Sequence, residues 1–195
     1  MGMKFKLLLS CVLVGWGFAI WSYLYAEEAT VVENSLQQDS IPVIIKEWKL
    51  AFVLPSEAWK LSEHGEHPEK GFSYYIYKRT PIEDEAGRRV IPNVGVIFER
   101  LPEEMDVITY SVIKRIATPF KVDSVFCWES GPISIKNAVG YIGSYEDKGI
   151  EHTILVAHIV NDKIGIQVIM DATQSIYPKV EGEFKFMMKS MRLLK

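Results

Sequence analysis

The pattern of hydrophobic and polar residues is most regular between Tyr141 and Met170, where three runs of strand length follow one another. Two short turns separate these runs, at Asp147-Lys148-Gly149 and at Asn161-Asp162, and such residue types favour tight reversals of the chain. The pattern therefore predicts three consecutive antiparallel strands.

The middle run, 150–160, has apolar residues on both faces of the strand that it would form. A sheet with one face in water alternates apolar and polar side chains, so this strand indicates a sheet that is covered on both sides. We expect helices to provide the cover. The predicted fold class is therefore α+β: an antiparallel β-sheet flanked by helices on both faces, in an α/β/α sandwich.

Two segments, 102–116 and 177–193, have apolar residues at helical spacing, which predicts two amphipathic helices. Further strands are predicted at 49–54, 72–78, 94–99, 121–126 and 132–136, and Trp59 is expected to return to the core after a turn at Pro55. The apolar stripes are Met105, Ile108, Val112 and Ile116 in the first helix, and Val180, Phe184, Met187, Met188 and Met191 in the second.

The first 26 residues have the layout of a secretory signal peptide, with two lysines, an apolar run over 7–25 and Ala26 before acidic residues. The run is long enough to span a bilayer, so an uncleaved membrane anchor is the alternative. Residues 27–40 are polar and aperiodic, which is typical of a flexible linker. The predicted organisation is a signal peptide or anchor at 1–26, a linker at 27–40 and a single domain at 41–195.

The charge distribution agrees with export and argues against one class of partner. The lysines precede the apolar run and acidic residues follow it, so the domain is expected in the periplasm or outside the cell, anchored to the inner membrane if the leader is kept. The formal net charge is -3 and no basic cluster is present, so nucleic-acid binding is not expected.

The chain has two cysteines, and Cys11 lies in the leader. A cleaved chain would keep only Cys127 and could form no internal disulfide. Between a reactive thiol and a small buried apolar side chain, we interpret Cys127 as the latter, because the sequence shows no base or helix start beside it.

One cluster is rich in metal-ligating residue types, and it runs from Glu63 to Glu69. Histidine and carboxylate side chains bind zinc, but a structural zinc site needs about four ligands in fixed geometry. Gly65 and Pro68 predict a polar loop in which the two imidazoles need not converge. No metal site is therefore predicted, and the candidate ligands by residue type are Glu63, His64, Glu66 and His67.

Catalytic motifs are absent from the sequence. His152 and His158 share one face of the predicted middle strand, but six residues of extended chain separate them by about 20 Å, so they cannot form one site. The chain has no Gly-x-Ser-x-Gly, His-Glu-x-x-His, phosphate-binding glycine loop or dinucleotide-binding motif. No catalytic residues, no cofactor-binding residues and no cofactor are predicted, and the protein is not expected to be an enzyme.

The order of these features resembles that of the PsbP-like proteins and of small exported bacterial proteins of the DcrB-like kind. The shared features are a signal segment, a strand with Phe52 and Pro55 followed by Trp59, a helix after the first strand pair, a glycine-containing meander and a terminal helix with Phe184. The resemblance covers 41–194 and is one of layout. It implies an α/β/α sandwich and a non-enzymatic accessory or binding role, and it transfers no functional residues.

The sequence thus predicts an exported, non-catalytic binding or accessory module of the bacterial cell envelope. Its partner would be an envelope protein or a small ligand, contacted through a sheet edge or a groove between layers. Two alternatives remain open. One is a metal-dependent hydrolase that uses the loop of His64 and His67, and the other is a membrane-anchored structural subunit that touches the membrane only through 7–25.

Overall fold

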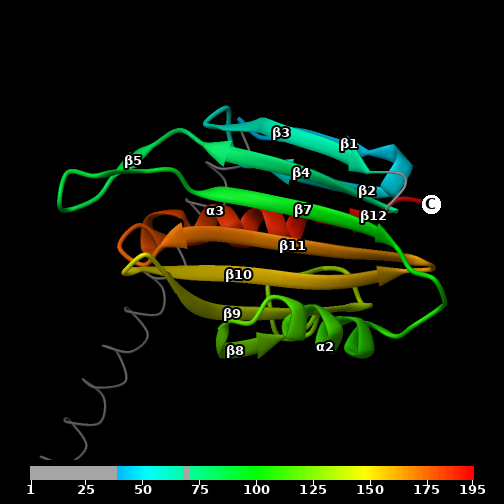
Figure 1. Cartoon of the computed structure of the whole chain (residues 1–195). Helices are drawn as coiled ribbons and strands as arrows, with labels where there is room; N and C mark the ends of the chain where they lie inside the picture. Colours follow the sequence, from blue (N-terminus) through cyan, green and yellow to red (C-terminus); the bar gives the residue numbers. More distant parts are fainter. Residues whose placement is uncertain (1–38, 68–70) are drawn as a thin grey trace, which may run out of the picture. The chain divides into compact units, whose positions relative to one another are not determined.

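The main feature of the fold is an antiparallel sheet of seven strands (Figure 1). It is seen in the computed structural model of the chain, which describes residues 39–67 and 71–195. The strands are β3 (Trp59–His67), β4 (Phe72–Arg79), β7 (Asn93–Arg100), β8 (Lys121–Phe126), β9 (Ala138–Asp147), β10 (Ile150–Asn161) and β11 (Ile164–Thr173). They lie side by side in the order β3-β4-β7-β11-β10-β9-β8.

The three antiparallel strands predicted between Tyr141 and Met170 are confirmed as β9, β10 and β11. In the register of these strands, Val156 of β10 lies opposite Tyr141 of β9 and opposite Ile169 of β11. All side chains of β10 from residue 154 to residue 160 are buried, so both faces of this strand are covered, as the sequence indicated.

The prediction of an α/β/α sandwich is wrong, because strands make up most of the described chain. The described residues contain two α-helices, α2 (Val107–Ala117) and α3 (Tyr177–Ser190), and the short 3-10 helix η1 (Lys46–Trp48). A second sheet is formed by β1 (Ile41–Ile45), β2 (Leu50–Leu54) and β12 (Arg192–Leu193), in the order β1-β2-β12.

The physical reason for this error is that a strand can bury a sheet face as well as a helix can. Phe52 of β2 packs edge to face on Tyr77, with ring centroids 5.4 Å apart, and Trp48 stacks on Phe98 at 5.2 Å. α3 packs against β2 and β11, whereas α2 packs against β9 and β10 (Figure 1). Each helix covers part of a face, so neither forms a helical layer.

The terminal helix buries the stripe that its sequence predicted. Val180, Phe184, Met187, Met188 and Met191 are all buried in the main core. Trp59 also lies in this core, as expected, and its indole Nε1 donates a hydrogen bond of 2.6 Å to Oε2 of Glu183. Glu183 also accepts two hydrogen bonds from the Arg79 guanidinium, at 2.8 and 2.9 Å, so α3 is tied to β3 and β4.

In the first predicted helix, the apolar stripe faces away from the core. An amphipathic helix normally turns its apolar stripe to the core, but Ile108, Val112 and Ile116 of α2 are exposed. Tyr110 and Ser111 are the buried residues of this helix. The sheet places Glu99, Tyr141 and His158 beneath α2, and the inward residues Tyr110 and Ser111 form hydrogen bonds with them.

Two local predictions differ from the structure. Glu63–His67, expected in a loop, belongs to β3, and 132–136, expected as a strand, is irregular. The loop at 80–92 carries a two-stranded ribbon of β5 (Ile82–Glu83) and β6 (Arg89–Val90).

The leader at 1–26 and nearly all of the linker lie outside the described residues. Within 39–67 and 71–195, no helix has both the length and the apolar character needed to cross a bilayer.

Cys127 is half-buried, so its interpretation as a buried apolar residue is only partly right. Its Sγ lies 3.6 Å from Oγ of Ser130. The hydrogen bond with this hydroxyl lowers the pKa of the thiol.

Gly165 allows α2 to lie close to β11, because a Cβ at this position would stand 2.5 Å from Cε2 of the buried Tyr110 ring. We expect Gly165→Ala to lower the free energy of unfolding by about 1–3 kcal/mol, since the ring and helix must shift. Gly182→Ala in α3 is the matched control, because its Cβ would have open space. That change should raise stability by up to about 1 kcal/mol, since alanine favours helix. Urea unfolding measures both, and equal effects would contradict the expectation.

Candidate functional site

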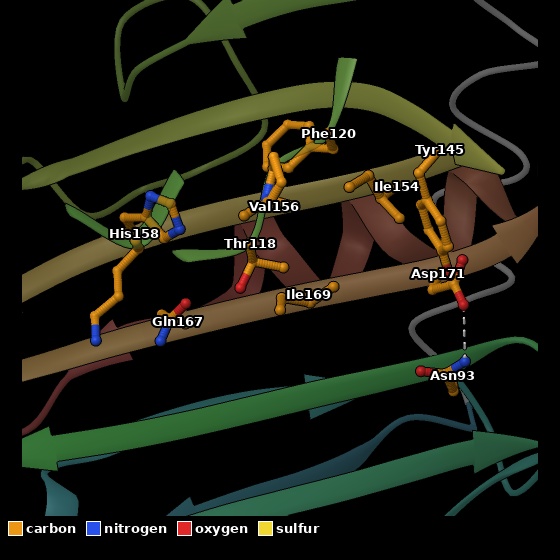
Figure 2. Close-up of a pocket in the computed structure, with 12 residues that line it drawn as sticks. Asn93, Thr118, Phe120, Tyr145, Ile154, Val156, His158, Gln167, Ile169 and Asp171 are labelled. Atoms are coloured by element: carbon orange, nitrogen blue, oxygen red, sulfur yellow. Dashed lines mark hydrogen bonds between the residues drawn. The ribbon is translucent and has the colours of Figure 1, made fainter. Parts of the chain in front are cut away.

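The strongest candidate site is a cleft on the sheet face beside the C-terminal end of α2. Figure 2 shows the residues that line it. Its volume is about 300 Å³, at the lower end of the range for small-molecule sites. Ile154 and Val156 of β10 and Ile169 of β11 form its apolar floor, and Phe120, which precedes β8, adds an aromatic ring. The cleft is therefore mainly apolar.

The register of β10 and β11 explains how this face acquires polar ends. Val156 lies opposite Ile169 in the middle of the cleft, whereas His158 lies opposite Gln167. At the other end, Ile154 lies opposite Asp171. Side chains two residues apart on a strand share a face, so these pairs line one surface in sequence order. Figure 2 shows the same arrangement, with His158 and Gln167 at one end and Asp171 at the other.

A buried hydrogen-bond network lies at the His158 end. Oγ of Ser111 is 2.8 Å from Nδ1 of His158 and 2.6 Å from the hydroxyl of Tyr141. The network joins α2 to both β10 and β9. Burial and, after it, the positive charges of Lys114 and Arg115 together lower the pKa of His158 to about 4, against an opposing effect of Glu99. The imidazole is therefore neutral at neutral pH.

The Ser111 and His158 pair resembles part of a nucleophile-and-base arrangement, in which a histidine removes the serine proton. A nucleophile must also reach its substrate. Ser111 is only 1% exposed and does not line the cleft. Its hydroxyl is shared between Tyr141 and His158, so the pair holds α2 on the sheet and presents no nucleophile to the cleft.

The opposite end of the cleft is organised by Asp171. Its Oδ1 lies 2.9 Å from Nδ1 of His152, and its Oδ2 accepts a 3.3 Å hydrogen bond from Nδ2 of Asn93. The Tyr145 ring stacks on the His152 ring with centroids 4.8 Å apart. Burial and the nearby Asp171 carboxylate raise the pKa of Tyr145, so its hydroxyl stays protonated.

Lys114, the cationic residue that lines the cleft, is also paired within the protein. Nζ of Lys114 donates a 2.6 Å hydrogen bond to Oε2 of Glu99, and Oε1 of Glu99 accepts a hydrogen bond of the same length from Tyr110. Lys114 and Asp171 thus both have protein partners. The arrangement favours burial of an apolar group in the cleft, because no charged group there must give up water without a partner.

A second hollow adjoins this cleft and shares Asn93 and Asp171 with it. Its volume is about 370 Å³, and Arg89, Ile150 and His152 are among the residues that line it. The two hollows together offer an apolar floor that continues into a more polar region.

The residues predicted as candidate metal ligands lie on β3, away from the cleft. His64 stacks on Tyr75 and lies opposite it in the register, and His67 lies opposite Phe72 with ring centroids 4.6 Å apart. Positions three apart on a strand face opposite sides of the sheet, so the strand separates the two imidazoles.

The other two candidates do not bring a ligand set together either. Glu63 accepts a 2.7 Å hydrogen bond from the Tyr74 hydroxyl, and Glu66 lies opposite Ser73. Across the part of the chain that the structure describes, no group of three or more His, Cys, Asp or Glu side chains is placed to hold a metal ion.

The sequence analysis did not find the cleft residues, because they come from five separate segments. It did place His152 and His158 on one face and far apart, and they lie towards opposite ends of the cleft. One signal was available for the acidic end. Asp171 is the one charged residue in the apolar run of β11, and a carboxylate in a buried strand needs partners.

The seven-stranded sheet, the second sheet of β1, β2 and β12, and the two helices define a PsbP-like fold, so the expected resemblance is confirmed at the level of fold. No family model matches the chain, and no curated protein matches it.

Three solved structures illustrate the likeness. LpqN, involved in cell envelope biogenesis of Mycobacterium tuberculosis, is 14% identical with a TM-score of 0.54, over 80% of this chain and 91% of LpqN. The cyanobacterial PsbP of Synechocystis sp. PCC 6803 is 10% identical with a TM-score of 0.50, over 80% and 92%. The Ran-binding protein Mog1p of Saccharomyces cerevisiae is 10% identical with a TM-score of 0.52, over 80% and 96%. At these identities the likeness shows the fold alone.

Proposed function

We propose that this protein is an exported, non-catalytic binding or accessory module of the bacterial cell envelope, and that it binds an amphipathic small molecule in the cleft beside α2. The observation that carries the proposal is the apolar floor of Ile154, Val156 and Ile169 between two polar ends whose charges are paired within the protein. An apolar group placed on this floor leaves water without breaking an ion pair, which favours binding.

The proposed ligand has an apolar part and a polar part. The apolar part lies on the floor beside Phe120, and the polar part extends past Asp171 into the adjoining hollow towards Arg89. The envelope location is supported by the leader at 1–26 and by the fold shared with LpqN, a protein involved in envelope biogenesis.

The test uses protein expressed from the full gene, recovered from the cell envelope and measured by denaturing and native mass spectrometry. We expect a denatured mass that corresponds to a chain starting at Glu27, and an additional mass that appears only under native conditions. A full-length mass in the membrane fraction would instead assign 7–25 as an anchor. Protein found only in the cytoplasm would overturn the proposed location.

The cleft is tested by filling it. Ile169→Trp places an indole on the floor and should reduce the amount of bound ligand at least about tenfold, because large side chains exclude ligands from small cavities. Ile44→Trp is the matched control, since Ile44 is exposed on β1 and does not line the cleft. The same bound mass in both variants, or none in the wild-type protein, would overturn the proposed site. Circular dichroism shows whether each variant is folded.

A further inference from the structure

The outward face of α2 is a surface that the cleft does not use. Ile108, Val112 and Ile116, here called the α2 ridge, are 57%, 53% and 77% exposed, and Ile113 beside them is 47% exposed. Side chains four residues apart form one continuous row along a helix. A row of three large apolar side chains in water costs free energy, so such a surface marks a site of interaction.

The charges at the two ends of the α2 ridge differ in sign. Residues 101–113 contain only acidic charges and residues 114–121 contain only basic ones. Lys114 pairs with Glu99, and the Arg115 guanidinium lies over the rings of Phe120 and Tyr141. Lys121 is the most exposed cation of the basic end, since its side chain is 79% exposed and its ion pair is a 3.5 Å contact with Asp123, which is itself exposed. The acidic end is formed by Glu103, Glu104 and Asp106.

This separation of charge makes the segment complementary to itself in one orientation. If two copies of α2 pack antiparallel, the acidic end of each lies against the basic end of the other. If they pack parallel, like charges meet. The side chain of Asp106 also caps the helix by accepting hydrogen bonds from the backbone amides of Ile108 and Thr109, so the ridge begins on an ordered turn.

We propose that the α2 ridge is a dimer interface, occupied by α2 of a second copy of this chain in antiparallel orientation about a two-fold axis at Val112. Ile108 and Ile116 lie four residues before and after Val112, about 6 Å along the helix in each direction. Each Ile108 therefore packs against the partner's Ile116, and the two Val112 side chains meet on the axis. This interface goes beyond the proposed function and does not depend on it.

Two other modes of association fit the structure less well. A second copy could pair through β8 at the edge of the sheet, but β8 has an irregular register between Val122 and Ser124 and carries Lys121 and Asp123, features that block edge pairing. The three acidic residues of 101–113 offset the attraction of the three basic residues of 114–121 to an anionic membrane surface, so this segment provides no net electrostatic attraction to it. The helix has eleven residues, so the interface is small and we expect dissociation constants in the micromolar range.

Cysteine cross-linking tests the register of the interface. The full chain is used with Cys127→Ser, and with Cys11→Ser if the leader is retained. Val112→Cys should give a disulfide-linked dimer on mild oxidation, because the two thiols meet on the axis. Ile108→Cys and Ile116→Cys should each cross-link poorly alone, since the two copies of one position lie about 12 Å apart along the helix. A mixture of these two variants should cross-link well.

Ile44→Cys is the control for random collision, because Ile44 is exposed on β1 outside the ridge. Cross-linking of this control as fast as that of Val112→Cys would overturn the proposal. So would efficient cross-linking of Ile108→Cys alone.

Sedimentation of the uncross-linked protein between about 1 and 100 µM tests the affinity. Val112→Glu should weaken self-association at least about tenfold, because it places two carboxylates on the axis. Glu104→Lys and Lys121→Glu should each weaken it, and the double variant should restore it, since the ends remain complementary. A monomer throughout this range, or a dimer unchanged by Val112→Glu, would overturn the interface.

Vesicles of phosphatidylcholine and phosphatidylglycerol test the alternative that the α2 ridge binds a membrane. A monomeric protein that binds these vesicles through the α2 ridge, and loses binding in Val112→Glu, would assign the ridge to a membrane and overturn the dimer. The cleft variant Ile169→Trp leaves the ridge intact, so failure of the dimer and failure of the proposed function give different results.

Discussion

Phe184→Ala should lower the free energy of unfolding by about 3–5 kcal/mol, which is a large share of the stability of a typical domain. The Phe184 side chain is fully buried, and its ring lies 5.8 Å from the Trp59 ring and 6.1 Å from the Tyr177 ring. Alanine leaves a cavity where α3 meets the sheet, and the buried aromatic rings around it can fill this space only in part.

Urea unfolding followed by tryptophan fluorescence measures this loss. Lys185→Ala is the matched control, because it changes the next residue of the same helix but removes only half of an exposed ion pair with Glu181. We expect the control to change stability by less than about 0.5 kcal/mol. A loss below about 1 kcal/mol in Phe184→Ala would show that α3 does not pack as described.

Stability should also fall as the pH is lowered from about 6.5 towards 4, and His158 should account for a large part of the fall. The pKa of His158 is lowered from 6.5 to about 4 in the folded protein, because burial disfavours the charged imidazole. Above about pH 6.5 neither the folded nor the unfolded chain binds the proton. Between these values only the unfolded chain binds it, so the free energy of unfolding drops by about 1.4 kcal/mol per pH unit, roughly 3 kcal/mol in total.

The variant that isolates this effect is His158→Asn, whose amide can keep a hydrogen bond with Ser111. Urea unfolding at about pH 7 and about pH 4.5 should show a smaller loss of stability in this variant than in the wild-type protein. Lys185→Ala, which retains the imidazole, should keep the wild-type loss. If His158→Asn loses as much stability as wild type between these two values, the buried neutral state of His158 is not the cause.

The strands of the fold could be predicted because their periodicity and turn residues are local properties of the chain. The run from Tyr141 to Met170 shows this, since both turns and the burial of both faces of β10 were expected. The nature of the cover could not be predicted in the same way. The strand of Phe52 buries the sheet as a helix would, and no local pattern in β10 states which kind of element lies against it.

The helices show the same limit of prediction from local sequence patterns. The stripe ending at Met191 is buried as predicted, whereas the stripe of Ile108, Val112 and Ile116 is exposed. Periodicity identifies the apolar side of a helix but not what covers it. The inward side of α2 is set by the hydrogen bond of Tyr110 with Glu99 and by that between Ser111 and His158, whose partners lie 11 and 47 positions away. No spacing in the sequence indicates such partners.

The candidate site was harder to predict than the fold, because it is assembled from five segments. His158 was seen as one of two distant histidines, but its partner Ser111 lies 47 positions away. The pairing of Asp171 with His152 and Asn93 likewise joins three strands. The four candidate metal ligands, by contrast, were adjacent in sequence, and the alternation of a strand then directed the two imidazoles to opposite sides.

The two helices are held in place by different means. α3 inserts Phe184 and its apolar neighbours into the main core, whereas α2 is held by hydrogen bonds of Tyr110 and Ser111 and by a small separate cluster of Tyr110 with Leu101 and Val160. Less apolar surface holds α2, so its detachment is a local opening that costs less free energy than unfolding of the whole sheet. Such an opening would uncover the floor of the cleft while the strands stay paired. The rates at which a ligand enters and leaves would then follow the local equilibrium of one helix, independently of the thermal stability of the domain.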